Sequence, residues 1–393
     1  MTEPIKLPRL IHIYIISLLI INIFSLSTIQ PLKQIGYYSI RVLLISVFLI
    51  FLYYLLNGYY TNKLKFVYLF TSGFITIQAL SFLINNDPGY LLFFYVLSVF
   101  AFIILSIQLK WDRNLLIGIG YIISFLIILL FIEWDWSPII GARFKSIFRN
   151  PNALAVFIFG SLYFQILAFK KVRKIGLKIY FLIILSISLI LLLATNSRAV
   201  FIAVLVVIVV SALQMYKPKL VKYAFWMAMA FNVSFLFIYV KLYNTVIGNL
   251  LNNFSLHIFN KNFFSGREKI WFNVWQHIEK SFLFGHGISA TARPLNEAGH
   301  TSHNQYLQTF LEVGLIGFIL FCLILWAIWK LLLDSQNTLE GRLSTSFFIS
   351  ILIYSTFELT LFQNNFQIGL IQWTIITIGI NLFPNKNIDS HLD

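Results

Sequence analysis

The chain is short of cysteine and of charge. Cys322 is its single cysteine, and only 11% of its 393 residues are charged. One cysteine excludes a disulfide within the chain and argues against a thiolate metal site. Soluble globular proteins carry about 25% charged residues. With 59% hydrophobic residues and a mean hydropathy of +0.83, this chain belongs in a lipid bilayer.

The chain instead contains many long apolar runs. A helix needs about 20 apolar residues to cross a bilayer. The sequence predicts an all-α, polytopic membrane protein with about 12 spans. Residues 1–393 form a single membrane domain, without the alternating segments of a β-barrel. The first run is too long for a cleaved signal and is expected to be retained. The predicted spans are 10–29, 38–57, 64–84, 89–109, 114–133, 150–169, 175–194, 198–215, 220–243, 303–330, 343–362 and 366–383.

Lysine and arginine alternate between the loops, and cytoplasmic loops are the ones that carry them. This pattern predicts that both termini are cytoplasmic. It also explains the net charge of +15 without nucleic acid as a partner. The predicted inner cations are Lys6, Arg9, Lys63, Lys65, Lys110, Arg113, the run 170–178, Lys217, Lys219, Lys222, Lys330 and Arg342.

Some cations break this pattern because they fall on the outer side. Solvated loops or contact with anionic lipid headgroups would explain several of them. Arg149 and Arg198 are harder to explain in this way, because a charge without a role costs free energy next to a span. The outer cations are Arg143, Lys145, Arg149, Arg198, Lys261, Arg267, Lys269, Lys280 and Arg293.

Residues 244–302 form the one large extracytoplasmic loop. Within it, GREKIWFNVWQHIEKSF places apolar residues at helical spacing, which predicts an amphipathic helix. Its tryptophans, Trp271 and Trp275, suit a membrane interface. The helix is either an interfacial structural element or a lid over a site at the membrane surface, and the two roles are compatible.

Recognisable catalytic motifs for soluble substrates are missing. There is no nucleotide-phosphate loop, dinucleotide fingerprint, nucleophile elbow or kinase signature, so an energised cytoplasmic substrate has no visible site. The outer carboxylates are scattered rather than paired as in Mg²⁺ sites. His300 and His303 have the spacing of metal ligands, but no cysteine or paired carboxylate accompanies them. We therefore expect no metal and no cofactor.

Polar residues concentrate between Ser265 and Gly317, where His303 and Asn304 stand at the start of a span. A histidine there suits a base or a hydrogen-bond donor, because its ordinary pKa is near neutral. A helix-capping or interface role is the alternative. The amides and the positive dipole end of the following helix favour an anionic ligand.

Two glutamates and two glycines in the predicted spans also call for an interpretation. Glu312 and Glu358 fall within predicted spans, where an ionisable group is a functional candidate. A buried pair with an outer arginine explains them equally well. Gly314 and Gly317 are interpreted as positions of close helix packing.

Several strings, taken together, resemble the O-antigen ligase and polysaccharide polymerase superfamily. The resemblance covers residues 148–321 by motif and the whole chain by topology. In that family a GR-x-x-x-W helix precedes a glycine turn, and a His-Asn pair opens a helix. The strings are FRNPNALA (148–155), TNSRAVFIA (195–203), SGREKIW (265–271), FGHG (284–287) and SHNQYLQTFLEVGLIG (302–317).

The resemblance implies transfer of a glycan from undecaprenyl diphosphate to an acceptor, at the outer face of the bacterial inner membrane. It implies that Arg198 and Arg267 bind the diphosphate and that His303 is catalytic. Forked arginine donors suit phosphate oxygens, and fixed cations stabilise the charge that develops on the leaving group. Arg143 and Arg149 would extend the cationic wall.

We expect Asn304, His300 and Asn152 to bind substrate as well. For Asn152, and for the neighbouring Asn150, helix capping after Pro151 is an equally good explanation. The implied partners are the lipid-linked oligosaccharide, a glycan acceptor, membrane lipids and other polysaccharide-assembly proteins.

Three functions fit the sequence. The first is a polymerase that lengthens lipid-linked repeat units, which the string SHNQYLQ favours. The second is a ligase that transfers the glycan to a lipid A core or another surface molecule. The third is a transporter or lipid flippase. Transporters usually show repeats and charged or broken helices at the midplane, whereas here the spans are nearly free of charge and the polar residues lie on one side.

Overall fold

The computed structural model describes residues 9–59, 61–136, 143–259, 262–297, 299–362, 365–380 and 382. These residues are helical or irregular, with one isolated bridge between Ser27 and Phe148 and no strand among them. The α-helices are α1 (Arg9–Asn22), α2 (Gln30–Leu56), α3 (Lys65–Ile84), α4 (Tyr90–Gln108), α5 (Arg113–Trp136), α6 (Pro151–Lys171), α7 (Ile175–Thr195), α8 (Arg198–Tyr216), α9 (Pro218–Val221), α10 (Ala224–Leu242), α11 (Val246–Phe259), α12 (Arg267–Ile278), α13 (Gln305–Leu333), α14 (Leu339–Tyr354) and α15 (Phe366–Ile378). Short 3-10 helices are η1 (Ile23–Leu26), η2 (Asn62–Leu64), η3 (Glu279–Ser281) and η4 (Arg293–Leu295).

Ten helical segments in the described part of the chain are long and apolar enough to cross a membrane. The protein is therefore an all-helical polytopic membrane protein, as the sequence predicts. The last two predicted spans, 343–362 and 366–383, differ from the expectation. Their helices α14 and α15 have 16 and 13 residues, or about 24 and 20 Å at 1.5 Å per residue, short of the about 30 Å hydrocarbon core.

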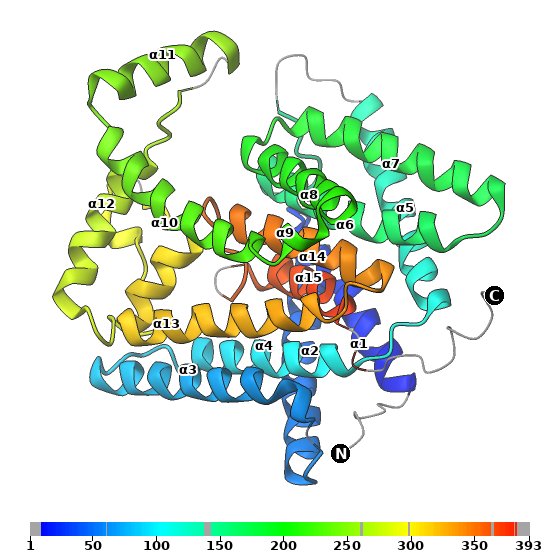
Figure 1. The fold of residues 1–393 in the computed structure, drawn as a ribbon, viewed down its shortest axis with the longest axis horizontal. Coiled ribbons are helices and arrows are strands. Elements are labelled where there is room, and N and C mark those ends of the chain that lie inside the picture. Colours follow the sequence, from blue (N-terminus) through cyan, green and yellow to red (C-terminus); the bar gives the residue numbers. More distant parts are fainter. Residues whose placement is uncertain are drawn as a thin grey trace.

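The centre of the molecule consists of α6, α14 and α15. Almost every side chain of α14 from Leu343 onward is buried, as is every side chain of α15 from Gln367 to Ile378 except that of Ile371. Helices that are apolar on all sides are expected in such a position. Figure 1 shows α14 and α15 in the middle of the bundle, with the antiparallel pair α3 and α13 along one side and α5, α7 and α8 on another.

The loops rich in lysine and arginine meet at one end of the bundle. The Arg113 Nε donates to the Lys171 carbonyl oxygen at 2.9 Å, which joins the start of α5 to the end of α6. Lys171 forms an ion pair with Glu340 at the start of α14. Gln214, near the end of α8, donates to the Arg342 carbonyl oxygen at 2.9 Å. The opposite ends of α6 and α8 are their first residues, which belong to the candidate site.

The amphipathic helix predicted in the long loop is α12, but its apolar face does not contact lipid. Ile270, Val274 and Ile278 pack with Trp271 against α10 and α13. Trp271 is 1% exposed, so the membrane contact expected for this tryptophan is wrong. Apolar side chains at helical spacing indicate burial, and periodicity alone cannot distinguish burial in protein from burial in lipid.

Candidate functional site

A residue with a strained backbone lies just before α13. His303 has φ +48°, in the left-handed region that few residues other than glycine adopt. The next residue, Asn304, caps the helix, because its Oδ1 accepts from the Leu307 N–H at 2.9 Å. Asn304 is fully buried. The reversal at His303 turns the chain into the helix while the imidazole stays 30% exposed.

The break between α14 and α15 places Glu358 beside this turn. The Gln305 N–H donates to the Ser355 carbonyl oxygen at 2.9 Å, and the Leu361 N–H donates to the Gln305 side-chain oxygen at 3.1 Å. These two bonds fix residues 355–361 against the start of α13. Glu358 thus lies in an irregular segment at the end of the bundle rather than inside a span.

Glu358 connects two of the predicted site residues. One carboxylate oxygen, Oε2, lies 3.0 Å from the His303 Nδ1, and the other, Oε1, lies 3.2 Å from the Arg267 Nη2. The Glu358 side chain is 16% exposed and that of Arg267 21%. A largely buried carboxylate between a cation and a histidine holds both side chains in fixed positions. We call these three residues the histidine cluster.

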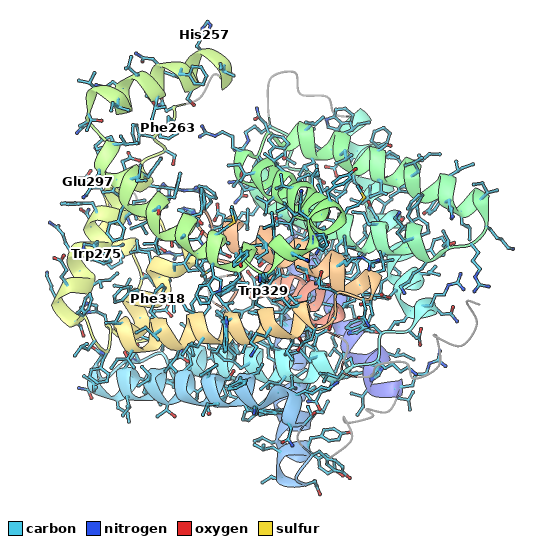
Figure 2. All side chains as sticks on the ribbon, in the orientation of Figure 1. His257, Phe263, Trp275, Glu297, Phe318 and Trp329 are labelled. Atoms are coloured by element: carbon cyan, nitrogen blue, oxygen red, sulfur yellow. The ribbon has the colours of Figure 1, made fainter. Side chains whose placement is uncertain are left out.

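The position of Arg267 depends on α12 and on the loop before it. Gly266 at the N-cap has φ +87°, a conformation that favours glycine. The Ser265 N–H donates to the Tyr239 hydroxyl of α10 at 3.1 Å. Four residues after Arg267, the Trp271 Nε1 donates to the Ser302 carbonyl oxygen at 2.7 Å. Arg267 and His303 are therefore positioned by the same helix, which Figure 2 shows below the labelled Phe263.

Arg143, Asn152 and Arg198 form a second group, the arginine cluster. The Arg143 Nε donates to the Thr195 carbonyl oxygen at 2.9 Å, and its Nη2 donates to the Asn152 Oδ1 at 2.7 Å. Burial, and next the neighbouring Arg198 guanidinium, lower the pKa of Arg143. The Arg198 Nη1 donates to the Asn262 carbonyl oxygen at 2.9 Å, in the loop that leads to Arg267.

No ion pair in the described part of the chain involves Arg143, Arg149 or Arg198. The Glu133 carboxylate contacts the same loop but accepts from the Ser146 hydroxyl. Arg149 is exposed, just before Asn150, which caps α6 by accepting from the Ala153 N–H at 2.8 Å. Like charges held close together favour an anionic ligand. The arrangement therefore suits a phosphate or diphosphate.

The histidine cluster suits proton transfer. When the His303 Nδ1 carries the hydrogen and donates to Glu358, Nε2 is the free acceptor; this tautomer is assigned from the hydrogen bond. A carboxylate behind the imidazole also stabilises the imidazolium that forms when Nε2 takes a proton. The exposed His300 ring lies 6.1 Å from the His303 ring, centroid to centroid.

The structure joins Arg267 and His303 in the histidine cluster, and Arg143, Asn152 and Arg198 in the arginine cluster. Arg149 and His300 belong to neither group. Asn304 caps α13 and Asn152 holds Arg143; substrate binding by either stays a prediction. For Glu358, the predicted pair with an outer arginine is confirmed, and Arg267 is the partner. The contact of Glu358 with His303 has no signal in the sequence.

Among the residues that the structure describes, no group of three or more histidine, cysteine, aspartate or glutamate side chains could hold a metal ion. Independence of a metal stays a prediction.

A comparison with protein families supports the motif assignment. Residues 181–322 match a family model described as O-antigen ligase. The match runs from α7 into α13 and includes Arg198, Arg267 and His303. The resemblance to the O-antigen ligase and polymerase superfamily is thereby confirmed. A search of curated proteins found no match.

Proposed function

From the match of residues 181–322 to a family model described as O-antigen ligase, we propose that the protein is a membrane glycosyltransferase. Its donor would be an oligosaccharide on undecaprenyl diphosphate, and the reaction would lengthen lipid-linked repeat units into a surface polysaccharide. The observation that carries the proposal is the contact of Glu358 with both His303 and Arg267. This contact supports a base and a phosphate-binding cation that share one carboxylate.

The arginine cluster would bind the diphosphate. Arg143 lies in the loop before α6 and Arg198 is the first residue of α8. Arg149 follows Arg143 in the same loop. A guanidinium has five N–H donors, and Arg267 uses one of them on Glu358. The remaining donors of Arg267 can reach phosphate oxygens near the reacting sugar. Fixed cations stabilise the leaving undecaprenyl diphosphate as it gains negative charge.

His303 would act on the acceptor hydroxyl. Its Nε2 takes the proton while the hydroxyl oxygen forms a bond to the anomeric carbon of the donor sugar. The bond from that carbon to the phosphate oxygen breaks, and its electron pair leaves with the diphosphate. Attack from the face opposite the leaving group inverts the anomeric configuration. Glu358 stabilises the resulting imidazolium through Nδ1.

The decisive assay uses purified protein and a synthetic undecaprenyl-diphosphate-linked repeat unit, with products resolved by size. We expect a ladder from the wild type and none from His303→Ala. Arg267→Lys should lose most of the activity although it keeps the charge, because the forked donors are lost. Arg293→Lys, at an exposed position in η4, is the matched control. Near-normal turnover by Arg267→Lys would show that Arg267 does not bind the phosphate.

Addition of EDTA should leave the wild-type ladder intact.

Ligation is the second candidate, and the description of the matching family favours it. No ladder from the wild type, followed by transfer once a lipid A core or another surface acceptor is added, would establish the ligase and reject the polymerase. No transfer with any acceptor would reject glycosyl transfer. Equal translocation of lipid-linked glycan by the wild type and His303→Ala would then favour a transporter.

A further inference from the structure

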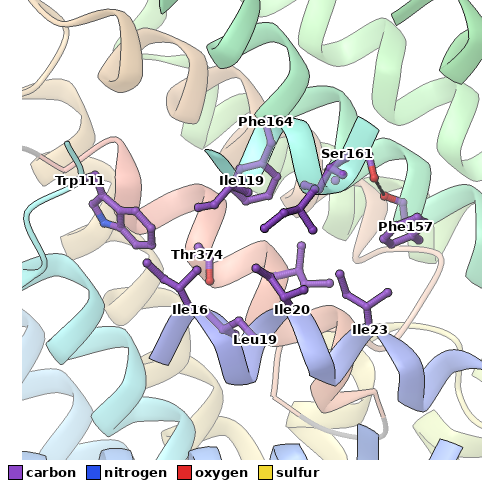
Figure 3. A pocket seen from close by; sticks show the side chains of 14 residues that line it. Ile16, Leu19, Ile20, Ile23, Trp111, Ile119, Phe157, Ser161, Phe164 and Thr374 are labelled. Atoms are coloured by element: carbon purple, nitrogen blue, oxygen red, sulfur yellow. Dashed lines mark hydrogen bonds between the residues drawn. The ribbon is translucent and has the colours of Figure 1, made fainter. Parts of the chain in front are cut away.

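A deep cleft separates α1 from α5 on the side of the molecule away from α12. Its inner part is a narrow cavity of about 50 Å³. Figure 3 shows one wall formed by Ile16, Leu19 and Ile20 of α1 and Ile23 of η1, with Phe157, Ser161 and Phe164 of α6 opposite. The Ser161 hydroxyl donates to the Phe157 carbonyl oxygen of its own helix. The inner part therefore presents an apolar surface.

The cleft continues into a second cavity of about 330 Å³. The two cavities share Ile16, Ile20, Ile119 and Ile122, so they form one continuous space. The second cavity extends to a polar mouth at the starts of α1 and α5, and its polar lining residues are Arg9, His12, Ser17, Asp112 and Asn114. The whole cleft thus has one apolar end and one polar end.

The dimensions match half a bilayer. His12 and Ile23 are 11 positions apart on α1 and η1, which corresponds to about 17 Å along a helix. Half of the hydrocarbon core is about 15 Å thick. A molecule that fills the cleft would therefore have its polar group at the membrane surface and its chain within a single leaflet.

Two polar atoms that line the cleft are buried without a hydrogen-bond partner in the described residues. They are the His12 Nε2 and the Trp111 Nε1, and each residue lines one of the two cavities. A buried polar atom without a partner costs free energy, so such atoms indicate a missing ligand or solvent contact. The Trp111 N–H is a donor and calls for an acceptor oxygen.

The mouth carries one charge of each sign, from Arg9 and Asp112. The Asp112 Oδ1 already accepts from the Leu115 N–H at 2.8 Å as a helix cap. No ion pair in the described residues involves Arg9, so its guanidinium is available to an anionic group. The mouth lies at the first residues of α5, whereas Arg143 follows the last residues of the same helix. The cleft is therefore at the opposite end of the bundle from the arginine cluster and is not its extension.

We propose that this cleft binds one anionic glycerophospholipid of the surrounding bilayer. One acyl chain lies between α1, α5 and α6, with Phe164 and Phe157 along its length. The phosphate and glycerol oxygens lie at Arg9, His12 and Trp111. The site is independent of the proposed glycosyl transfer, because none of its residues belongs to the histidine or arginine cluster.

Gly118 offers a direct test. It lines the second cavity, and a Cβ at this position would meet no atom within 4 Å. Gly118→Leu would therefore place a side chain in the cleft without a clash in the protein. Gly176 on α7 is equally open but lies outside the cleft. Gly176→Leu is the matched control for any effect of the added side chain on folding.

The experiment measures lipid binding by native mass spectrometry of detergent-purified protein, with phosphatidylglycerol or phosphatidylethanolamine added. We expect one tightly bound phosphatidylglycerol on the wild type and on Gly176→Leu. Gly118→Leu should lose it. Arg9→Gln should weaken phosphatidylglycerol binding about tenfold, the value of one charge-assisted hydrogen bond. Phosphatidylethanolamine, whose ammonium offsets the phosphate charge, should bind the wild type more weakly than phosphatidylglycerol does.

Three results would overturn the proposal. Unchanged phosphatidylglycerol binding by Gly118→Leu would place the lipid elsewhere on the protein. Equal affinity of the wild type for the two lipids would show that the cleft does not select an anionic headgroup. A dimer that Gly118→Leu dissociates would identify a second copy of the chain as the occupant.

Discussion

At the scale of single residues, Glu358 gives the site its geometry. It contacts a histidine whose backbone is strained and an arginine at the first turn of a helix. Strained residues persist only where the surrounding structure holds them, and they cluster at functional sites. The Gln305 and Ser355 bond supplies that support at His303. Glu358 thus positions two groups without itself having to contact the substrate.

Substitution of Glu358 by Gln tests this positioning role. The amide keeps the shape but removes the charge that stabilises the His303 imidazolium and pairs with Arg267. We expect kcat to fall about ten- to a hundredfold, the value of a hydrogen bond to a charged group, with a smaller change in KM. The pH profile of kcat should change as well, since the partner of Nδ1 changes. Steady-state assays of glycan transfer across pH measure both effects.

Glu297→Gln serves as the control for this variant, because Glu297 is exposed in the loop after η4. It should retain wild-type kinetics. A purely structural role of Glu358 predicts something different: reduced amounts of folded protein with an unchanged pH profile in the fraction that remains. That result would contradict positioning.

At the scale of elements, the break within α13 shapes the region around the site. Gly314 has φ +64° and ψ −168°, a conformation open essentially to glycine alone. The break lets the Leu315 N–H donate to the Phe282 carbonyl oxygen at 2.8 Å, and the Gly287 N–H donates to the Glu312 carbonyl oxygen at 3.1 Å. From the sequence, Gly314 is interpreted as a position of close helix packing. The structure shows that it also docks the turn after α12.

Gly314→Ala should therefore destabilise the protein. The new Cβ would lie 2.3 Å from the Leu283 carbonyl carbon and oxygen, which are backbone atoms that cannot move aside cheaply. Backbone strain of this kind costs about 1–3 kcal/mol. We expect a lower temperature of unfolding in detergent and lower activity. Gly176→Ala, at a position with open space, should leave both unchanged, and an equal loss in the two variants would reject the explanation.

The contact between α12 and the following turn should depend on pH. The His277 and His286 rings stack with centroids 4.0 Å apart, and the His286 Nε2 lies 2.7 Å from the His277 carbonyl oxygen. Burial, followed by His286 and Lys280, lowers the pKa of His277 below its usual 6.5. The unfolded chain then binds the proton more readily than the folded protein.

The sign of the effect follows from this difference. The contribution of His277 to stability is fully present above pH 6.5 and is lost as the pH falls through the lowered folded value. Thermal unfolding of the wild type should therefore occur at lower temperature in mildly acidic buffer. His277→Gln should reduce that dependence on pH, and an identical dependence in wild type and variant would contradict it.

At the scale of the whole molecule, charge and hydropathy predict most of the architecture. Long apolar runs are a local property, so ten helices long enough to cross a membrane follow from the sequence. The short α14 and α15 do not follow, because the break between them depends on tertiary bonds such as that of Leu361 to Gln305. For the same reason, motifs indicate Arg267 and His303 as site residues, but only the fold shows that one carboxylate joins them.

The orientation of the bundle is the last prediction. The cation-rich loops lie at the ends of α6 and α8 opposite to the arginine cluster. The positive-inside rule therefore predicts a cytoplasmic position for Lys174 and an outer position for Glu297, both of which are exposed. Figure 2 shows Glu297 at the edge of the molecule near α12. In a Cys322→Ala background, Glu297→Cys should react with a membrane-impermeant maleimide on intact cells, and Lys174→Cys only after permeabilisation. Because the donor sugar and its acceptor would meet outside the cytoplasm, the reverse labelling pattern would contradict the orientation and the proposed reaction together.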